Sequence, residues 1–319
     1  MRKAFFTAGT IDDLMRDVIL EIQTNGKPVD ATRGPNRELL GVLLELEDPR
    51  ARLSSTETRG KLFSCLGELC WYLARSNDAD FISYYIPAYT YDAEDGVLHG
   101  AYGPRWLDWK GLNQVTNVTE TLKKRRSSRQ AVVQVFDADD IVGEHRDVPC
   151  TCTLQFTVRD DRLQMLTHMR SNDAYLGLPH DVFSFTMLQE IVARSLSVEL
   201  GSYNHFVGSL HLYDKNKDKS QAFIDEGLQS TKFRMPPMPP GNPWPAISVL
   251  LDAEMKIRTQ GAGVVGELKD VEPYWADLVR LLQIFRYAND EDWDGIRTIG
   301  EKVSVDTYRP FIAQKLSSR

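Results

Sequence analysis

The sequence predicts an α+β protein that forms a single domain over residues 1–319. Two observations lead to this fold class. Segments with the apolar period of amphipathic helices are interleaved with short segments that fit strands, and two of those strands are close enough in sequence to form a hairpin. The chain shows no internal repeat or low-complexity tract, and its length is sufficient to bury a sizeable core.

In the first half of the chain, helical periodicity alternates with Gly and Pro. The first helix is expected to begin at the capping pair Thr10 and Asp13 and to end at Gly26. The expected elements are a helix over 11–22, a loop over 33–37, an apolar helix over 61–73 and an irregular tyrosine-rich region over 84–109.

The second half carries the strand signals. Alternating and β-branched residues predict strands, and the Arg159-Asp160-Asp161-Arg162 segment predicts the turn between two of them. A stiff, proline-rich surface spacer is expected at 235–240. The other expected elements are strands over 130–136, 152–158, 163–168 and 203–213 and an amphipathic helix over 183–200.

The composition excludes several classes of protein. Hydrophobic content of 42% and charged content of 26% are typical of a soluble globular chain. The net charge of −7 argues against a bulk nucleic-acid binder, although it allows a small anionic ligand. No apolar run reaches the length of a membrane span, and the first residues lack the apolar core of a signal peptide. We therefore expect a cytoplasmic protein without membrane or nucleic-acid partners.

Four cysteines in a chain of this length do not form a disulfide framework. Cys65 and Cys70 lie in an apolar helical pattern and are expected in the core. Cys150 and Cys152 project to the same face of a strand, but a lone C-x-C motif is weak support for a metal. The histidines show no metal-ligand spacing with the cysteines, so no metal is assigned.

Cys150 and Arg170 are the first candidates for chemistry. A cysteine becomes a useful nucleophile when nearby positive charge or a base favours its thiolate. Arg170 lies within a hairpin's reach of Cys150, so its guanidinium is expected to face the thiol. Because most cysteines are structural, this pair alone defines only a candidate site.

The motifs around this pair resemble those of the thymidylate synthase family in order and spacing, from about residue 33 to residue 213, and the likeness fades beyond Tyr213. The resemblance implies a mixed sheet flanked by helices and a homodimer formed through that sheet. It also implies two substrates, a pyrimidine nucleoside monophosphate and 5,10-methylenetetrahydrofolate. The motifs are Glu68-Leu69-Cys70-Trp71-Tyr72-Leu73, Gly100-Ala101-Tyr102-Gly103-Pro104-Arg105-Trp106, Pro149-Cys150, Gln155-Phe156, Arg170-Ser171-x-Asp173, Leu176-Gly177-Leu178-Pro179 and Gly208-x-x-His211-x-Tyr213.

The resemblance also implies roles for individual residues around the base. Cys150 adds to C6 of the pyrimidine, and Arg170 helps to keep its thiol ionised. Glu68 orders water and relays protons, and Tyr102 supports proton removal from C5. Without the family motifs, Glu68 would instead be read as a partner of a buried arginine.

Other implied roles concern the phosphate, the sugar and the folate. Arg33 resembles the arginine of the phosphate loop, but Gly34-Pro35 replaces part of that loop and makes Arg37 a competitor. The remaining assignments are Arg170 and Ser171 for the phosphate, His211 and Tyr213 for the sugar hydroxyl, and Asp173 and Gly177 for the folate side of the pocket. Taken alone, His211 would be read as a strand histidine with satisfied hydrogen bonds.

In the family, a pair of arginines crosses from the partner subunit to the same phosphate. Ser128-Arg129-Gln130 resembles that segment but keeps only one arginine. Arg129 is therefore the candidate, and Arg125 and Arg126 either supply the missing charge or form a solvated basic run.

Asp181 departs from the family pattern, which has asparagine at this position. An amide can donate to the 4-carbonyl of uracil and accept from its N3–H. A carboxylate only accepts, so it suits the 4-amino group of cytosine, and it accepts from both edges when N3 is protonated. Since a site with an unpaired buried polar group rejects the wrong base strongly, Asp181 indicates a cytosine nucleotide.

This departure matches the hydroxymethylase branch of the family, in which water adds where a synthase delivers hydride. The expected activity is 5-hydroxymethylation of CMP or dCMP, and CMP is favoured because the chain lacks clear likeness to phage enzymes outside the shared motifs. The ribose product serves nucleoside-antibiotic synthesis and the deoxyribose product serves modified-DNA synthesis. The alternatives are a reductive C5-methylase and a non-catalytic relative that binds a nucleotide or mRNA.

Overall fold

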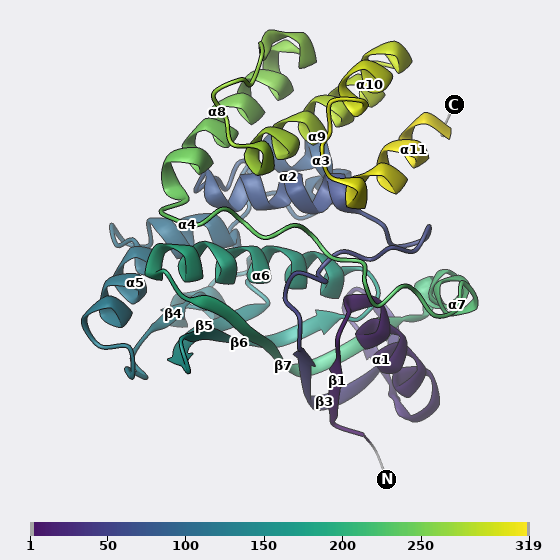
Figure 1. Ribbon diagram of the computed structural model, residues 1–319. Coiled ribbons are helices and arrows are strands. Elements are labelled where there is room, and N and C mark those ends of the chain that lie inside the picture. Colours follow the sequence, from purple (N-terminus) through teal and green to yellow (C-terminus); the bar gives the residue numbers. More distant parts are fainter. Residues whose placement is uncertain (1–2, 318–319) are drawn as a thin grey trace.

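The computed structural model describes residues 3–317 and shows an α+β fold built on a mixed sheet flanked by helices (Figure 1). Its seven strands lie in the order β1-β3-β7-β6-β5-β4, with β2 paired to β3. The β1/β3 and β6/β7 pairs are parallel and the other pairs are antiparallel. The strands are β1 Phe5–Ala8, β2 Lys27–Ala31, β3 Gly34–Leu46, β4 Val132–Gln134, β5 Thr151–Arg159, β6 Arg162–Asp173 and β7 Glu199–Tyr213.

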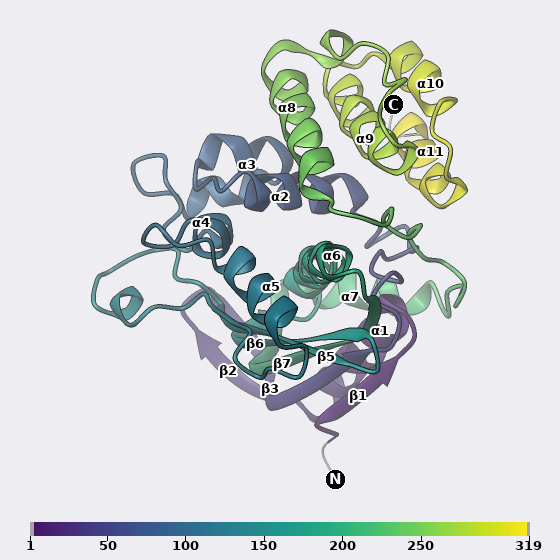
Figure 2. The ribbon, with the colours of Figure 1, turned by 60° about the vertical axis from the view of Figure 1, so that its left-hand side comes forward.

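The helices lie in layers on one side of the sheet (Figures 1 and 2). Helix α6 packs on β6 and β7, α2 packs on α6, and α8 and α9 pack on α2. Among residues 3–317, no helix combines the length and apolar character needed to cross a bilayer. The helices are α1 Ile11–Asn25, α2 Leu62–Leu73, α3 Ala79–Tyr85, α4 Tyr102–Leu107, α5 Gln114–Lys124, α6 Gly177–Leu196, α7 Lys217–Asp225, α8 Trp244–Gln260, α9 Pro273–Asn289, α10 Trp293–Gly300 and α11 Arg309–Ser317.

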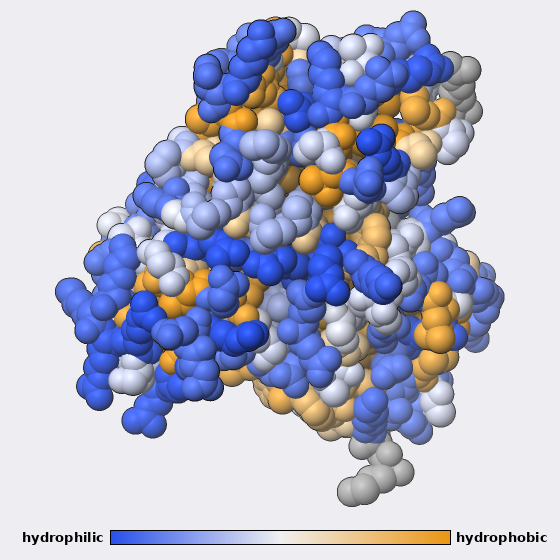
Figure 3. All heavy atoms as spheres, in the orientation of Figure 1, coloured by the Kyte–Doolittle hydropathy of each residue, from blue (hydrophilic) through white to orange (hydrophobic). Residues whose placement is uncertain are grey.

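The opposite face of the sheet is free of helices in the described part of the chain (Figure 2). Side chains alternate across a strand, so the exposed Leu40, Val132 and Leu166 point away from the buried neighbours that face the helices. The face seen in Figure 3 mixes hydrophilic and hydrophobic patches. The exposed Leu40, Val132 and Leu166 make the free face of the sheet partly apolar.

Several sequence predictions are confirmed. The first helix begins at Thr10, whose side chain accepts a hydrogen bond from the Asp13 N–H, and it ends at Gly26. The predicted hairpin is the antiparallel pair β5/β6, which is longer than expected. The helix over 61–73 is α2, and the last predicted strand is β7, which starts four residues earlier.

The loop expected over 33–37 is instead part of a β-hairpin. Ala31 pairs with Gly34 across a turn at Thr32 and Arg33, and β3 continues from there. Gly34 has a φ of 118°, which disfavours other residues, and Pro35 is tolerated at the start of a strand. Gly and Pro therefore shape the hairpin rather than interrupt it.

The helix expected over 183–200 is shifted toward the N-terminus. Its first turn includes Pro179, which is compatible with the start of a helix, and it ends where Ser197 adopts a left-handed conformation. The shift places Asp181 on the helix and leaves residues 199 and 200 to β7.

Other elements also differ from the prediction. The strand over 130–136 is only the three-residue β4, and the irregular region over 84–109 contains α4. The proline-rich segment is not a surface spacer, because Met235 and Met238 are only 1% exposed and the Met238 N–H donates to the Glu190 carboxylate. It runs as a strap between α6 and the C-terminal helices (Figure 1).

Candidate active site

The start of β5 and the end of β6 bring Cys150 and Arg170 together. The Arg170 N–H donates to the Cys150 carbonyl at 2.8 Å. The Arg170 guanidinium donates to the carbonyls of Val148 and Pro149, each at 2.9 Å, which holds its charge beside the segment that carries the thiol. The structure therefore places the Arg170 guanidinium next to the segment that ends in Cys150, as the sequence predicts.

The charge of Arg170 acts on the thiol in the expected direction but does not dominate. Burial raises the pKa of Cys150, and the nearby carboxylates of Asp181 and Asp147 add to the rise. Arg170 and Arg33 lower the pKa without offsetting these effects. The free protein thus holds a protonated thiol at neutral pH, and the thiolate must form when the site is engaged.

Glu68 lies on α2 and is buried against tyrosines rather than against an arginine. The Tyr89 hydroxyl donates to Glu68 Oε1 at 2.6 Å. Burial raises the pKa of Glu68 to about 7, although hydrogen bonds from Tyr89 and Tyr72 act in the opposite direction. A carboxyl group with this pKa can both give and accept a proton near neutral pH, which suits a proton relay.

Glu68→Gln is expected to flatten the pH dependence of the free energy of unfolding. The folded pKa is raised from 4.5 to about 7, so the stability linked to the protonated form is complete below pH 4.5 and is lost as the pH rises through 7. This rise in pKa, from 4.5 to about 7, corresponds to a loss of about 3 kcal/mol in the free energy of unfolding across that pH range. Glutamine does not titrate, so the variant should lack this loss. Denaturant unfolding of both proteins from pH 4.5 to 8.5 measures the effect.

The exposed Glu301→Gln is the control for this experiment and should leave the pH profile unchanged. Parallel profiles for the wild type and Glu68→Gln would show that Glu68 ionises normally in the folded protein.

Tyr102 opens α4 and connects Glu68 to the thiol region. Its ring stacks on Tyr72 with centroids 5.3 Å apart. Burial raises the pKa of Tyr102 well above its usual value, and the charges of Asp181 and Cys150 add to this rise. The hydroxyl therefore stays protonated and is placed among the other candidate catalytic groups.

Asp181 lies in the first turns of α6, beside the same cluster. Asn172 Nδ2 donates to Asp181 Oδ2 at 2.7 Å. Burial raises the pKa of Asp181 well above its usual value, and the charge of Glu68 adds to this, whereas the bond from Asn172 opposes it. Asp181 thus holds a proton more readily than an exposed aspartate does.

The residues expected at the phosphate and the sugar gather at the ends of β6 and β7. Ser171 Oγ lies 3.5 Å from His211 Nδ1, and the rings of His211 and Tyr213 meet edge to face at 4.8 Å. Arg33 is exposed, pairs with Asp92 at 2.9 Å and acts electrostatically on Cys150 and Tyr213.

Arg37, the alternative to Arg33, lies on β3 in register with Leu212. It lines a separate depression together with Asp214 and Lys217. The geometry therefore favours Arg33 over Arg37 as a cation close to the thiol.

Asp173 and Gly177 have structural positions next to Asp181. Asp173 Oδ1 accepts the N–H groups of Tyr175 and Leu176, which shapes the turn that leads into α6. Burial raises the pKa of Asp173. A carboxylate held in this way has acceptor chemistry that fits the N–H donors of a folate ring.

Arg129 is not brought to the site of its own chain. Its carbonyl accepts from Gln155 Nε2, which lies four residues beyond Thr151 on β5, or about 13 Å along the strand. Arg126 pairs with Asp161, and Arg125 contacts Ser127 at the surface.

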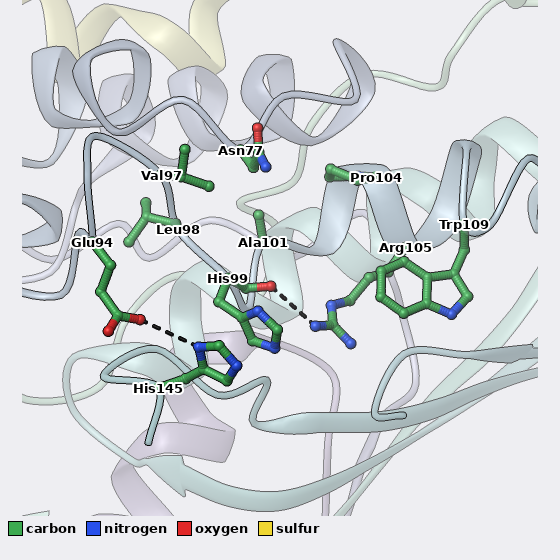
Figure 4. A pocket seen from close by; sticks show the side chains of 10 residues that line it. All are labelled: Asn77, Glu94, Val97, Leu98, His99, Ala101, Pro104, Arg105, Trp109 and His145. Atoms are coloured by element: carbon green, nitrogen blue, oxygen red, sulfur yellow. Dashed lines mark hydrogen bonds and ion pairs between the residues drawn. The ribbon is translucent and has the colours of Figure 1, made fainter. Parts of the chain in front are cut away.

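Beside the candidate site, a pocket lies along the segment that carries Gly100 (Figure 4). Its lining includes Glu94, His99 and His145. Its rings of His99 and His145 stack at 3.6 Å, and Glu94 lies 3.5 Å from His145. Next to it, the Gly100 N–H donates to Asp147 at 2.9 Å. These contacts hold the segment that precedes Tyr102 against the segment that precedes Cys150.

Sequence reasoning missed Asn172, Tyr89 and Asp147 as members of the site. Asn172 stands inside the Arg-Ser-x-Asp motif at an unassigned position, and no local signal in the sequence marks it, because its role depends on its contacts with Asp181 and His205. Within residues 3–317, no group of three or more His, Cys, Asp or Glu side chains has an arrangement that could hold a metal ion.

Comparisons with known proteins agree with this geometry. The thymidylate synthase family model matches residues 32–239, more than half of the chain, so the chain belongs to the thymidylate synthase family. This family consists of folate-dependent one-carbon transferases that act on pyrimidine nucleotides.

Individual relatives match over shorter stretches. A thymidylate synthase of Listeria monocytogenes serotype 4a is 30% identical over 146 residues, covering 44% of this chain and 45% of that protein. A deoxyuridylate hydroxymethyltransferase of Pseudomonas phage M6 is 32% identical over 167 residues, covering 51% and 48%. The chain thus spans about half the length of the curated relatives it matches.

Proposed function

We propose that this protein transfers a hydroxymethyl group to C5 of a cytosine nucleoside monophosphate. The observation that carries the proposal is Asp181, a partly buried carboxyl at the position where the family has asparagine, with one oxygen bonded to Asn172. The other oxygen is left to meet the base. A carboxyl there suits the 4-amino group and N3 of cytosine and disfavours the carbonyl of uracil.

The raised pKa of Asp181 supports the same choice of base. Burial favours the protonated acid, which can pass its proton to the unprotonated N3 of cytosine. The resulting carboxylate then accepts from both N3–H and the 4-amino group. Protonation at N3 also makes the ring a better acceptor for attack at C6.

The remaining groups fit the chemistry at C5 and C6. Cys150 adds to C6, and Arg170 and Arg33 favour the thiolate that this attack requires. Glu68, with a pKa of about 7, and Tyr102 move protons and order water near C5. The folate substrate supplies the one-carbon unit, held at Asp173 and Gly177. Overall, nucleotide, 5,10-methylenetetrahydrofolate and water give the 5-hydroxymethyl nucleotide and tetrahydrofolate.

Both CMP and dCMP belong to the proposal. The preference for CMP rested on a lack of likeness to phage enzymes. A phage deoxyuridylate hydroxymethyltransferase matches half of the chain at an identity close to that of the thymidylate synthases, so this match does not separate CMP from dCMP. His211 and Tyr213, whose rings meet edge to face, are the residues proposed for the sugar hydroxyl, so the two nucleotides are best compared side by side.

Reductive C5-methylation is the second candidate, and it is favoured by the likeness to thymidylate synthases. Release of tritium from C5-labelled CMP, dCMP and dUMP separates the options. The proposal expects faster release from a cytosine nucleotide. Faster release from dUMP would refute the assignment based on Asp181, and no release from any of the three would leave only a binding role.

We also propose a homodimer formed through the free face of the sheet, which carries the exposed Leu40, Val132 and Leu166. In this dimer Arg129, which lies away from its own Cys150, completes the phosphate site of the partner. Arg129→Ala alone is expected to lower activity.

Mixing Arg129→Ala with Cys150→Ala is therefore expected to restore activity. One site of each mixed dimer then has both its own Cys150 and an intact Arg129 from the partner. With random exchange, activity should reach about a quarter of the wild-type value. Activity no greater than that of the separate variants would place Arg129 outside the partner's site. The same mixture with Arg126→Ala tests the alternative arginine.

A further inference from the structure

Asp181 stands at the end of a buried chain of hydrogen bonds that starts at Tyr203. The Tyr203 hydroxyl lies 2.7 Å from His205 Nδ1, and His205 Nε2 lies 3.2 Å from Asn172 Oδ1. Asn172 Nδ2 then donates to Asp181 Oδ2 at 2.7 Å. Tyr203 and His205 lie on β7, Asn172 on β6 and Asp181 on α6, so the chain joins three elements.

The chemistry of each partner gives this chain one direction. Complete burial lowers the pKa of His205 to about 3, so its ring is neutral and carries a single N–H. The Asn172 carbonyl can only accept, which places that N–H on Nε2. His205 Nδ1 is then an acceptor and receives the Tyr203 O–H. Every donor therefore points toward Asp181.

The direction of the chain determines which face of the Asn172 amide meets Asp181. With the amide N–H₂ toward Oδ2, that oxygen acts as an acceptor, and any proton on Asp181 resides on Oδ1. A flipped amide would present its carbonyl to Oδ2 and draw the proton there. Only the first arrangement leaves the proton on the oxygen that is free to meet the base.

We propose that Tyr203 and His205 are positioning residues for base selection, because they orient Asn172 so that Asp181 presents its proton at Oδ1 to N3 of cytosine. This inference rests on the proposed function. A change of tautomer at His205, which lies on β7, would then be transmitted through Asn172 and Asp181 to the base.

Gly177 leaves the room that this arrangement requires. A Cβ added at Gly177 would lie 3.0 Å from Asn172 Nδ2 and 3.5 Å from Asp181 Oδ2. The absence of a side chain there lets the amide and the carboxyl approach each other at the start of α6.

The first test measures the His205 tautomer in the ligand-free protein by long-range ¹H–¹⁵N NMR of the imidazole nitrogens. We expect the Nε2–H tautomer in the wild type. In Tyr203→Phe the Asn172 carbonyl still accepts from Nε2–H, so this tautomer should persist, while the Nδ1 resonance should move to that of a ring nitrogen that accepts no hydrogen bond. An Nδ1–H or doubly protonated ring in the wild type would overturn the inference whatever the protein's substrate is.

The second test compares kcat/KM for dCMP and dUMP, and for CMP and UMP, in matched variants. Tyr203→Phe and His205→Leu are expected to lower the preference for cytosine by about tenfold, the upper range for one lost hydrogen bond between neutral groups. His205→Gln supplies an N–H toward Asn172 and should retain most of the preference. A merely structural role would reduce turnover of both bases equally and leave the ratio unchanged, which would refute the inference.

The two tests also separate the inference from the proposed function. A wild-type protein that does not prefer cytosine contradicts the proposed function, and the NMR result then still decides the direction of the chain. A wild-type preference for cytosine that survives in Tyr203→Phe and His205→Leu contradicts only the inference.

Discussion

Cys150→Ala is expected to abolish tritium release from the C5-labelled nucleotide, with a loss of about four orders of magnitude or more. Removal of the thiol removes the nucleophile whose addition to C6 activates C5. Arg170, Ser171 and His211, the residues proposed for the phosphate and the sugar, are unchanged in this variant, so nucleotide binding should stay measurable by calorimetry.

Cys152→Ala is the matched control, because Cys152 lies two residues farther along β5 and has a half-buried thiol. It is expected to release tritium at close to the wild-type rate. Loss of release in Cys152→Ala together with retained release in Cys150→Ala would contradict this prediction, because it would show that Cys152 is the nucleophile.

Asp181→Asn is expected to shift the preference from the cytosine to the uracil nucleotide by about two orders of magnitude or more in the ratio of kcat/KM values. The amide can donate to the 4-carbonyl and accept from N3–H of uracil, but it has no proton to pass to N3 of cytosine. Steady-state rates with dCMP and dUMP measure the ratio.

Asp181→Ala distinguishes base selection from general damage to the site. It should slow both nucleotides and favour neither. An unchanged ratio in Asp181→Asn would mean that another residue chooses the base.

Local pattern was sufficient to predict much of the fold and the proximity of the central candidate residues, Cys150 and Arg170. Helical periodicity located α1 and α2, and β-branched residues located the β5/β6 hairpin, because these signals depend on neighbours in sequence. The motifs around Cys150 and Arg170 predicted a pairing that the structure brings together.

The features that sequence pattern missed depend on distant partners. Gly34-Pro35 looks like a break, and only pairing with β2 and β7 makes it the start of β3. Asn172 is informative because it meets both Asp181 and His205, which no local spacing reveals. Likewise, the pKa of Cys150 depends on burial that outweighs the charge of Arg170.

The origin of the oxygen in the product tests the central claim most directly. The measurement is mass spectrometry of the nucleotide formed from dCMP or CMP and 5,10-methylenetetrahydrofolate in H₂¹⁸O. We predict a 5-hydroxymethylcytosine nucleotide that carries one ¹⁸O atom, with tetrahydrofolate as the second product. A 5-methyl nucleotide without ¹⁸O, formed together with dihydrofolate, would contradict it.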